Sequence, residues 1–395
     1  FLQTQPDSRE WFNILGGDGN TTAVGLTKDD DGHVTSATRY FSSNDPFEAG
    51  DDGRQRSLKQ ATGEPHPTNG EFIVLDRRAR VRAEKEVDGE FLNFGFAVNP
   101  HNEDRFLLGR FGLYESTDGG ETLQSFSSKK NPANLKYFRS VAYGGTADAT
   151  AAYASFGGQI GVRAPGRNKF TFKSLSNAKA ISDIVVDPDD WQTAYAADPV
   201  ANRVYGTNDG GRNWRIISEN LPLQQASSVE LAKLDDQDVL LVGGVEGVFR
   251  AFDPDDAVQE KAQPLWTELG IDLPNAIVKS ISYTPAMMFR EANGDLRPIG
   301  DVLVAGTLGR GAFKIPNASA AIREEVVLEI EAEDDTRAIR IQVNGDNPLM
   351  VDVYLDTPAG PADHPVIRTP ISTISRIDVD LTNGPAGQDA VSVTV

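Results

Sequence analysis

Two turn-forming stretches decide the fold of this chain. Residues 112–123 read GLYESTDGGETL, and residues 203–214 read RVYGTNDGGRNW. Each has a short apolar run around a tyrosine, then a polar turn with a central aspartate and two glycines, and then a larger apolar residue. Gly and Asp favour tight turns, and the flanking residues favour strands. Each stretch therefore predicts two strands joined by a turn that a carboxylate closes.

The same pattern recurs at an interval of roughly 45 residues, the length of one unit in a repeat protein. Tyr114 and Tyr205 are 91 residues apart, residues 159–168 form a degenerate copy halfway between them, and Phe249 follows Tyr205 after 44 residues. A serine opens an apolar run upstream of the turns, at Ser140, Ser182, Ser228 and Ser280. Four short strands in a repeat of this length are typical of a β-propeller blade.

We therefore predict an all-β chain with a β-propeller of about six to seven four-stranded blades over residues 1–316. Residues 317–321 are small and polar and predict a linker. Residues 322–395 alternate apolar and polar residues at period two, which predicts a small β-sandwich-like module. Residues 287–297 interrupt the repeat as an insertion, a candidate contact surface because binding groups gather in loops on a rigid scaffold.

Composition excludes several classes of function. The chain has 38 basic and 58 acidic residues, a formal charge of −20, which opposes binding to nucleic acid. It has no cysteine, so it offers neither disulfides nor thiolate metal sites. No apolar run approaches the roughly 20 residues of a membrane span. Because the chain begins at Phe1, we expect it to be part of a larger polypeptide or assembly.

The aspartates of the two turns are expected to hold structure. A short carboxylate at Asp118 or Asp209 can accept hydrogen bonds from turn amides that the strands leave unpaired. The neighbouring residues have supporting roles as hydroxyl donors, as glycines in a backbone conformation closed to other residues, and as an apolar contact between blades: Ser116, Gly120, Thr207, Gly211 and Trp214.

The pattern Ser/Thr-x-Asp-x-Gly-x-Thr-Trp resembles the Asp-box, or BNR repeat, of sialidases, sortilin-like receptors, family 74 xyloglucanases and photosystem II assembly factors. Residues 16–19 (GGDG) and 306–313 (GTLGRGAF) are similar to motifs of sortilin-like and xyloglucanase-like propellers. The resemblance covers about residues 1–316 and implies a propeller, but no single activity. The chain lacks the Phe/Tyr-Arg-Ile-Pro motif of sialidases and the cysteine-rich module of eukaryotic sortilins.

Two kinds of chemistry have candidate residues. Glycoside hydrolysis needs two carboxylates, about 5–5.5 Å apart for retention or about 6.5–9.5 Å for inversion. Asp18, Asp183 and Glu230 are the catalytic candidates, because inner-strand ends face the central channel of a propeller. Residues 386–391 (AGQDAV) resemble one degenerate calcium-repeat turn, which makes Asp389 the candidate calcium ligand. A plain β-turn is the alternative for this segment. No cofactor is expected, and calcium is the candidate ion.

The resulting hypothesis is a secreted or cell-surface structural and binding protein. The resemblance implies this location, since similar modules follow propellers in bacterial surface proteins. Its partner would be a polysaccharide or a protein at the cell surface. The alternative is a glycoside hydrolase that acts on polysaccharide through channel-facing carboxylates. The four tryptophans favour binding, because their positions suit blade packing better than a substrate cleft: Trp11, Trp191, Trp214 and Trp266.

Overall fold

The computed structural model describes residues 2–3, 11–12, 19–43, 59–63, 75–77, 95–110, 112–119, 122–126, 137–145, 148–234, 237–269, 276–323, 327–331, 338–343, 350–356, 361–362, 364–370, 376–380 and 392–394. Three of the predicted site residues, Asp18, Gly120 and Asp389, lie outside these ranges.

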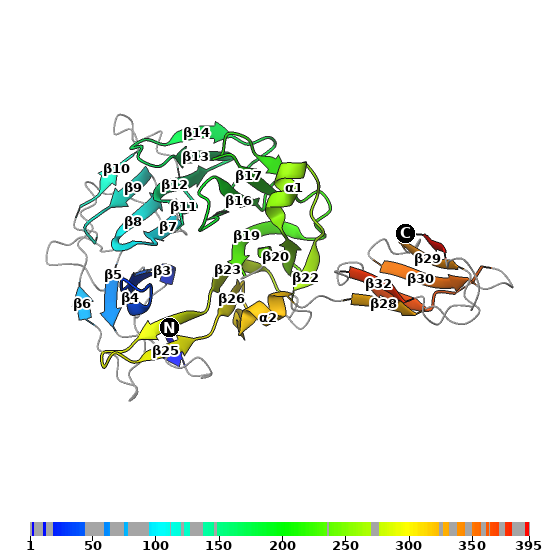
Figure 1. The fold of residues 1–395 in the computed structure, drawn as a ribbon. Coiled ribbons are helices and arrows are strands. Elements are labelled where there is room, and N and C mark those ends of the chain that lie inside the picture. Colours follow the sequence, from blue (N-terminus) through cyan, green and yellow to red (C-terminus); the bar gives the residue numbers. More distant parts are fainter. Residues whose placement is uncertain are drawn as a thin grey trace.

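Four antiparallel sheets of identical plan stand side by side around a ring (Figure 1). In each, four strands that are consecutive in sequence pair with their sequence neighbours. The first two sheets contain β7 (Gly95–Asn99), β8 (Asn102–Arg110), β9 (Gly112–Ser116), β10 (Gln124–Ser125), and β11 (Val141–Gly144), β12 (Asp148–Phe156), β13 (Gln159–Arg163), β14 (Thr171–Ser174). The next two contain β15 (Asp183–Val186), β16 (Thr193–Asp198), β17 (Arg203–Asn208), β18 (Arg215–Ile216), and β19 (Gln224–Lys233), β20 (Asp238–Val245), β21 (Gly247–Phe252), β22 (Thr267–Leu269).

Two further sheets complete the described part of the ring. One contains β3 (Gly19–Lys28), β4 (Val34–Ser43), β5 (Lys59–Gly63) and β6 (Leu75–Arg77). The other contains β23 (Val278–Thr284), β26 (Val302–Thr307) and β27 (Gly311–Pro316). A short pair, β1 (Leu2–Gln3) and β2 (Trp11–Phe12), lies near the N-terminus.

The aromatic residues that mark the repeat occupy equivalent places. Tyr114, Tyr205 and Phe249 each lie in the third strand of their sheet, opposite Leu108, Ala196 and Val242 of the second strand. Equivalent positions in successive sheets are what a radial repeat requires. The fold is therefore a β-propeller, and the blade count of six to seven stays a prediction.

The hydrophobic core lies between the faces of neighbouring sheets. One cluster joins Tyr195 and Val204 of the β15–β18 sheet to Val229, Leu240 and Phe249 of the next sheet. The innermost strands are also neighbours, with β7 beside β11, β11 beside β15, β15 beside β19 and β19 beside β23. Each blade thus buries its faces against adjacent blades, and the inner strands bring side chains from different repeats together.

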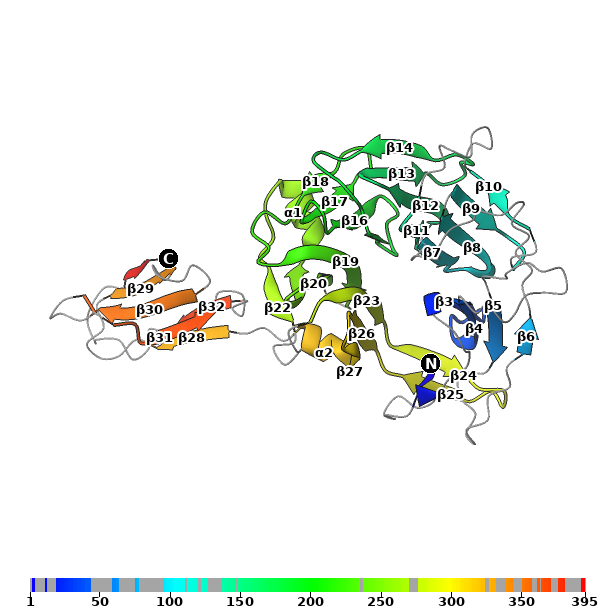
Figure 2. The ribbon, with the colours of Figure 1, turned by 180° about the vertical axis from the view of Figure 1, so that it is seen from behind.

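The insertion at residues 287–297 forms a hairpin of β24 (Met287–Arg290) and β25 (Leu296–Ile299). β24 pairs in parallel with β4 through Phe289 and Val34, so the hairpin links the last described blade sheet to the first (Figure 2). Arg290 extends this link, because its guanidinium donates to Asp29 Oδ2 at 2.5 Å and to Asp31 Oδ2 at 3.0 Å. The insertion therefore makes contacts between two blade sheets of the ring.

Two short helices accompany the sheets. α1 (Pro254–Glu260) follows β21 and packs Val258 over Gly206 of β17, where a Cβ atom would lie 2.5 Å from Val258 Cγ2. α2 (Ala318–Arg323) follows β27, where the sequence predicted a linker over residues 317–321. Ala318 and Ile322 are buried in one cluster with Val278 and Leu303, a tertiary contact that composition does not reveal. Among the described residues, no helix is long and apolar enough to cross a membrane.

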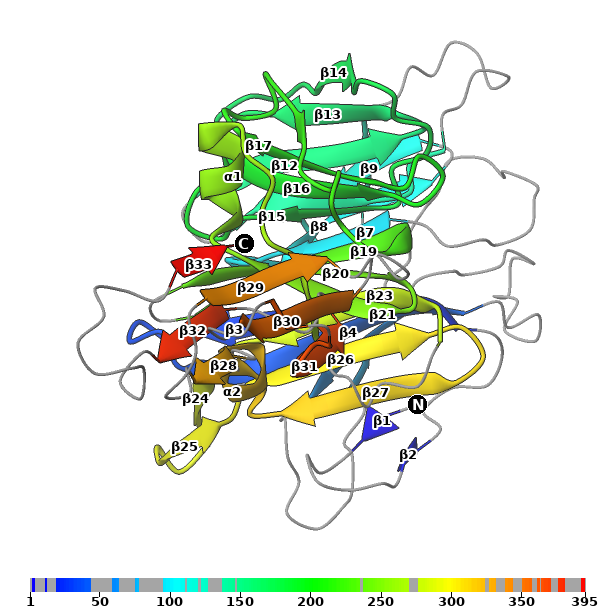
Figure 3. The same cartoon turned by 90° about the vertical axis from the view of Figure 1, so that its right-hand side faces the viewer.

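The C-terminal strands lie beside the ring in Figure 1 and in front of it in Figure 3, and they form two sheets. β28 (Val327–Glu331) pairs in parallel with β32 (Arg376–Asp380). The second sheet contains β31 (Ile367–Pro370), β30 (Met350–Asp356), β29 (Ala338–Val343) and β33 (Ser392–Thr394). This is the small all-β module predicted from the period-two pattern.

Candidate functional site

The turn at Asp118 is closed by local hydrogen bonds. Asp118 Oδ1 accepts from the Thr122 main-chain N–H at 2.9 Å and from the Ser116 hydroxyl at 2.9 Å, and Oδ2 accepts from Thr122 Oγ1 at 2.5 Å. These bonds, first those from Thr122, lower the pKa of Asp118. The carboxylate is therefore an ionised acceptor for its own turn.

Asp209 has the same geometry two repeats further along the chain. Its carboxylate accepts from the Asn213 N–H at 2.8 Å, from Asn213 Nδ2 at 2.6 Å and from the Thr207 hydroxyl at 3.0 Å. Burial alone raises the pKa of Asp209, but the bonds from Asn213 outweigh it and the pKa is lowered. Trp214 packs edge-on against Tyr153 of the preceding sheet, with ring centroids 6.4 Å apart. Such contacts suit the corner role predicted for this turn.

The catalytic candidates Asp183 and Glu230 lie on neighbouring inner strands, β15 and β19. Asp183 Oδ2 accepts from the Ser228 hydroxyl at 2.8 Å and from the Val229 N–H at 3.1 Å, and Oδ1 accepts from the Ile184 N–H at 3.0 Å. Glu230 likewise accepts main-chain bonds, from Tyr283 and Leu231. Each carboxylate thus ties its own strand to the inner strand of the next blade.

The two carboxylates share an electrostatic environment. Both residues are half-buried, and because the inner strands converge around them, burial is the first cause that raises both pKa values. The charge of Asp183 is the second cause for Glu230, whose pKa rises to about 8. Asp183 accepts hydrogen bonds from more donors than Glu230 does, and these bonds partly offset the effect of burial on the pKa of Asp183.

The serines of the repeat make further links between inner strands. Ser182 Oγ donates to the Ser227 carbonyl at 2.8 Å, and Ser227 Oγ donates to the Val278 carbonyl at 2.7 Å. Ser155 Oγ lies 3.3 Å from the Ile181 carbonyl, which adds the same kind of link one blade earlier. Asp183 and Glu230 therefore belong to a set of polar side chains that join adjacent blades near the ring axis.

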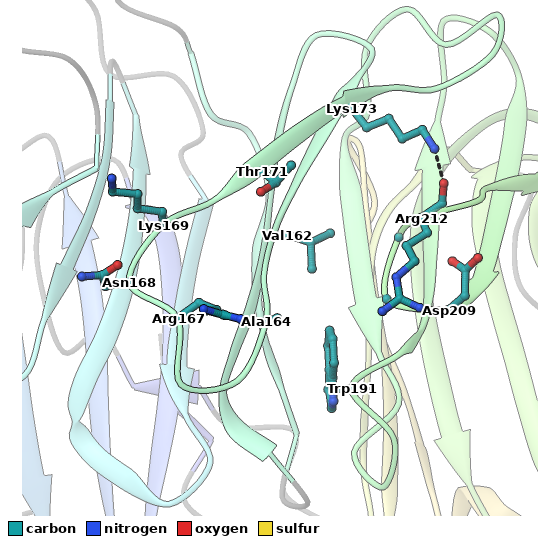
Figure 4. A pocket seen from close by; sticks show the side chains of 12 residues that line it. Val162, Ala164, Arg167, Asn168, Lys169, Thr171, Lys173, Trp191, Asp209 and Arg212 are labelled. Carbon is teal, nitrogen blue, oxygen red and sulfur yellow. Dashed lines mark hydrogen bonds between the residues drawn. The ribbon is translucent and has the colours of Figure 1, made fainter.

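A crevice of about 540 Å³ opens between the β11–β14 blade and the β15–β18 blade (Figure 4). One wall is the β13–β14 hairpin, and the other is the turn that holds Asp209 together with Trp191. The lining residues are Val162, Ala164, Arg167, Asn168, Lys169, Thr171, Lys173, Trp191, Asp209, Gly210, Gly211 and Arg212.

Cations dominate the polar lining of this crevice. Four cationic side chains, those of Arg167, Lys169, Lys173 and Arg212, stand against one carboxylate, Asp209, and all four cationic residues are exposed. Lys173 Nζ donates to the main-chain oxygen of Arg212 and so ties the two walls together (Figure 4). No ion pair is found within the described residues for Arg167, Lys169 or Arg212. The crevice therefore concentrates positive charge in a chain of net charge −20.

Close packing holds the two walls in place. A Cβ atom at Gly211 would lie 2.7 Å from Val162 Cγ2, and one at Gly210 would lie 3.0 Å from the Trp191 ring. Both glycines have positive φ angles, 75° at Gly211 and 71° at Gly210. Only glycine meets both demands at low cost, so the turn packs directly against the opposite blade and the indole.

The sequence did not point to this crevice. Arg167, Lys169 and Lys173 alternate along one hairpin, a pattern that is visible in the sequence and also typical of a solvated face. Arg212 lies in another repeat, so the cluster forms only when the two blades are adjacent. The sequence assigned Trp191 to blade packing; Trp191 does contact the Asp209 turn, and it also lines the crevice.

A buried ionic cluster was also missed. Arg163 donates two bonds to Glu115 in the neighbouring blade, at 2.8 and 2.9 Å, and Arg105 and the Tyr143 hydroxyl each donate to Glu115 at 2.9 Å. Arg163 and Glu115 are 2% and 5% exposed. Despite burial, the bonds from Arg163 and Arg105 lower the pKa of Glu115. Both carboxylate oxygens of Glu115 accept from protein donors, so this cluster holds blades together.

Asp29, Asp31 and His33 form an acidic group with metal-ligand spacing. Arg290 donates to both carboxylates and lies 2.9 Å from His33 Nδ1. The bond from Arg290 is the first cause that lowers the pKa of Asp29 to about 2. The Arg290 guanidinium thus occupies the position that a metal ion would need. Through these contacts the turn at residues 29–33 holds the β24–β25 hairpin in place.

No protein-family model matches this chain, and no curated protein matches it. The solved structures with similar folds include an ancestral GH74 enzyme, at 11% identity and a TM-score of 0.38, covering 88% of this chain and 59% of that one. PorZ, a surface component of the type-IX secretion system of Porphyromonas gingivalis, is 13% identical with a TM-score of 0.46, covering 85% of this chain and 45% of that one. YCF48 bound to D1 peptide is 12% identical with a TM-score of 0.35, covering 66% of this chain and 88% of that one.

This chain thus spans 59% and 45% of the lengths of the first two structures. These propellers include an enzyme, a secretion-system component and a peptide-bound protein. Likeness at this level selects none of these activities.

Proposed function

We propose that this chain is a binding and structural module of a secreted or cell-surface protein. The observation that carries the proposal is the crevice between the β11–β14 and β15–β18 blades. It has rigid walls, an indole and a cluster of exposed cations in a chain that is otherwise strongly acidic. Binding sites are concave and combine apolar lining with a few oriented polar groups, within about 300–1,000 Å³. The crevice has this composition and size.

The hydrogen bonds that Asp183 and Glu230 accept favour a binding function over glycoside hydrolysis. A catalytic carboxylate must be free to meet a glycosidic oxygen, an anomeric carbon or a water. Asp183 instead accepts from Ser228, Val229 and Ile184, and the bonds from Ser228 and Val229 link β15 to β19. Replacing either carboxylate would therefore first disturb the contacts between blades.

A glycoside hydrolase is the second candidate, and one observation favours it. The raised pKa of Glu230, about 8, keeps a proton on its carboxyl group at neutral pH, and the carboxyl group of Asp183 is close enough to contribute to that shift. A protonated acid beside a carboxylate is the pairing that glycoside hydrolysis uses. The hydrolase reading then requires that substrate displaces the main-chain donors of both groups.

One experiment separates the two functions. The wild-type chain, Asp183→Asn and Glu230→Gln would be incubated with a panel of neutral and acidic polysaccharides, and both retention and released reducing ends would be measured. We expect retention of at least one polysaccharide without released sugar. Sugar release that disappears in a folded Glu230→Gln variant would replace the binding proposal with the hydrolase.

A further inference from the structure

We propose that the crevice between the β11–β14 and β15–β18 blades is a binding site for an anionic polysaccharide, one whose sugars carry carboxylate or sulfate groups. This inference rests on the proposed binding function and names the class of ligand. It places the recognition in Arg167, Lys169 and Arg212, with Trp191 as the apolar contact.

The charge of the crevice selects an anionic ligand. Arg167, Lys169 and Arg212 are exposed and make no ion pair within the described part of the chain. Arg167 and Arg212 point from two blades into the space between the walls (Figure 4), and Lys169 lines the same crevice from the β13–β14 hairpin, so their fields add at the place where a ligand would lie. Asp209, the one carboxylate in the lining, already accepts from Asn213 and Thr207.

The position of the crevice over a sheet face favours a polysaccharide over an extended peptide. Thr171 and Lys173 are two residues apart on β14, so both lie on one face of the sheet, and Thr171 stands opposite Val162 in the pairing register. The ligand would therefore lie over a sheet face, away from the free edge of β14. A peptide that adds a strand needs that edge. A sugar chain needs side-chain donors and an aromatic contact, which this face offers.

Trp191 supplies the aromatic contact. Its ring lies between the two walls beneath Val162 (Figure 4), where Gly210 approaches one edge of the indole. Pyranose C–H groups carry partial positive charge and pack well on the negative face of an indole. The cations would meet the carboxylates or sulfates of the same sugars. Arg can do so with two parallel hydrogen bonds.

The test measures binding of defined oligosaccharides to the full chain by calorimetry. The probes are oligogalacturonate, its methyl-esterified neutral form, dextran sulfate with unmodified dextran, and poly-glutamate as an acidic peptide. We expect the acidic sugars to bind and their neutral counterparts to bind at least tenfold more weakly. Higher ionic strength should weaken binding, as expected for exposed charges. Preference between carboxylate and sulfate would identify the source of the anionic groups.

Matched variants locate the site. Lys169→Ser with Arg212→Ser should weaken binding at least tenfold, while Lys279→Ser with Arg310→Ser removes two exposed cations outside the crevice and should change it less than twofold. Thermal unfolding of both double variants should match that of the wild type. Equal loss in both would overturn the crevice as the site. Tighter binding of poly-glutamate than of any sugar would overturn the ligand class.

The two proposals fail separately. If a neutral polysaccharide or a protein binds and the crevice variants bind it normally, the anionic-polysaccharide inference is wrong while the binding function stands. If no ligand of any class is retained and sugar is released, the binding function itself is wrong.

Discussion

At the scale of single residues, burial in the fold changes the protonation of Glu230. Its pKa of about 8 lies above the ordinary value of 4.5, so the folded state holds the proton more tightly than the unfolded chain between these pH values. The stability that this group contributes is therefore complete below about pH 4.5 and is lost as the pH rises through about 8. Glu230→Gln removes the titration and keeps the shape.

We therefore expect Glu230→Gln to be more stable than the wild type at pH 8.5 and similar to it at pH 5.5. Denaturant unfolding at the two pH values gives both free energies. A wild type and variant that lose the same stability between pH 5.5 and pH 8.5 would show that Glu230 is ionised in the folded chain.

Asp209 gives a second prediction at this scale. Asp209→Ala leaves the Asn213 and Thr207 donors without their acceptor, and we expect a loss of about 1–3 kcal/mol in the free energy of unfolding. Asp30→Ala, in an exposed turn, is the control and should change little. Unchanged unfolding of Asp209→Ala together with lost polysaccharide binding would instead assign Asp209 to the crevice.

At the scale of strands and blades, Arg163 on β13 and Glu115 on β9 form a buried ion pair between sheets. Glu115→Gln removes the negative charge that Arg163 and Arg105 both face, and Arg163→Met leaves Glu115 with only the donors of Arg105 and Tyr143. We expect Glu115→Gln or Arg163→Met alone to cost about 3–5 kcal/mol, and the double variant to cost less than the sum. A double-mutant cycle from urea unfolding measures this coupling, and additive losses would contradict it.

The difference between what the sequence predicts and what it misses follows the range of the interactions. The turns at Asp118 and Asp209 are local, because donor and acceptor are at most four residues apart, so the sequence predicts where they form. The serines likewise predict where inner strands form, since Ser140 and Ser182 directly precede β11 and β15, while Ser228 and Ser280 lie within β19 and β23. They do not predict that Ser182 bonds to Ser227 in the next blade. Such a contact depends on the spacing of blades, which a repeat of varying length leaves open.

The candidate site divides in the same way. Asp183 and Glu230 could be placed on inner strands, since strand order within a repeat is readable. Their engagement by main-chain donors of the next blade could not. The crevice was missed because Lys169 and Arg212 come from different repeats, and a cation cluster across a blade boundary has no signature in either repeat.

At the scale of the whole molecule, we propose that the propeller extends to the end of α2. Ala318 and Ile322 are fully buried against the last described blade sheet. Arg250, which is 2% exposed, donates to the Ala321 and Ile322 carbonyls at 2.9 and 2.6 Å. Asp301 adds a link, because its main-chain oxygen accepts from the Asn317 N–H at 2.8 Å. These contacts place the helix inside the propeller core.

We therefore expect a chain that ends at Arg323 to unfold like the propeller of the full-length protein. A chain that ends at Pro316 exposes the apolar surface that Ile322 covers and removes the two carbonyl oxygens of α2 to which Arg250 donates. Burying a side chain such as that of Ile322 is worth about 1.5–3 kcal/mol, and the lost hydrogen bonds of the buried guanidinium add to the loss. Thermal unfolding of both truncations, compared with the full chain, tests the boundary. If the shorter chain melts with the longer one, α2 is a linker after all, and if the 1–323 chain does not fold, the ring depends on the C-terminal module.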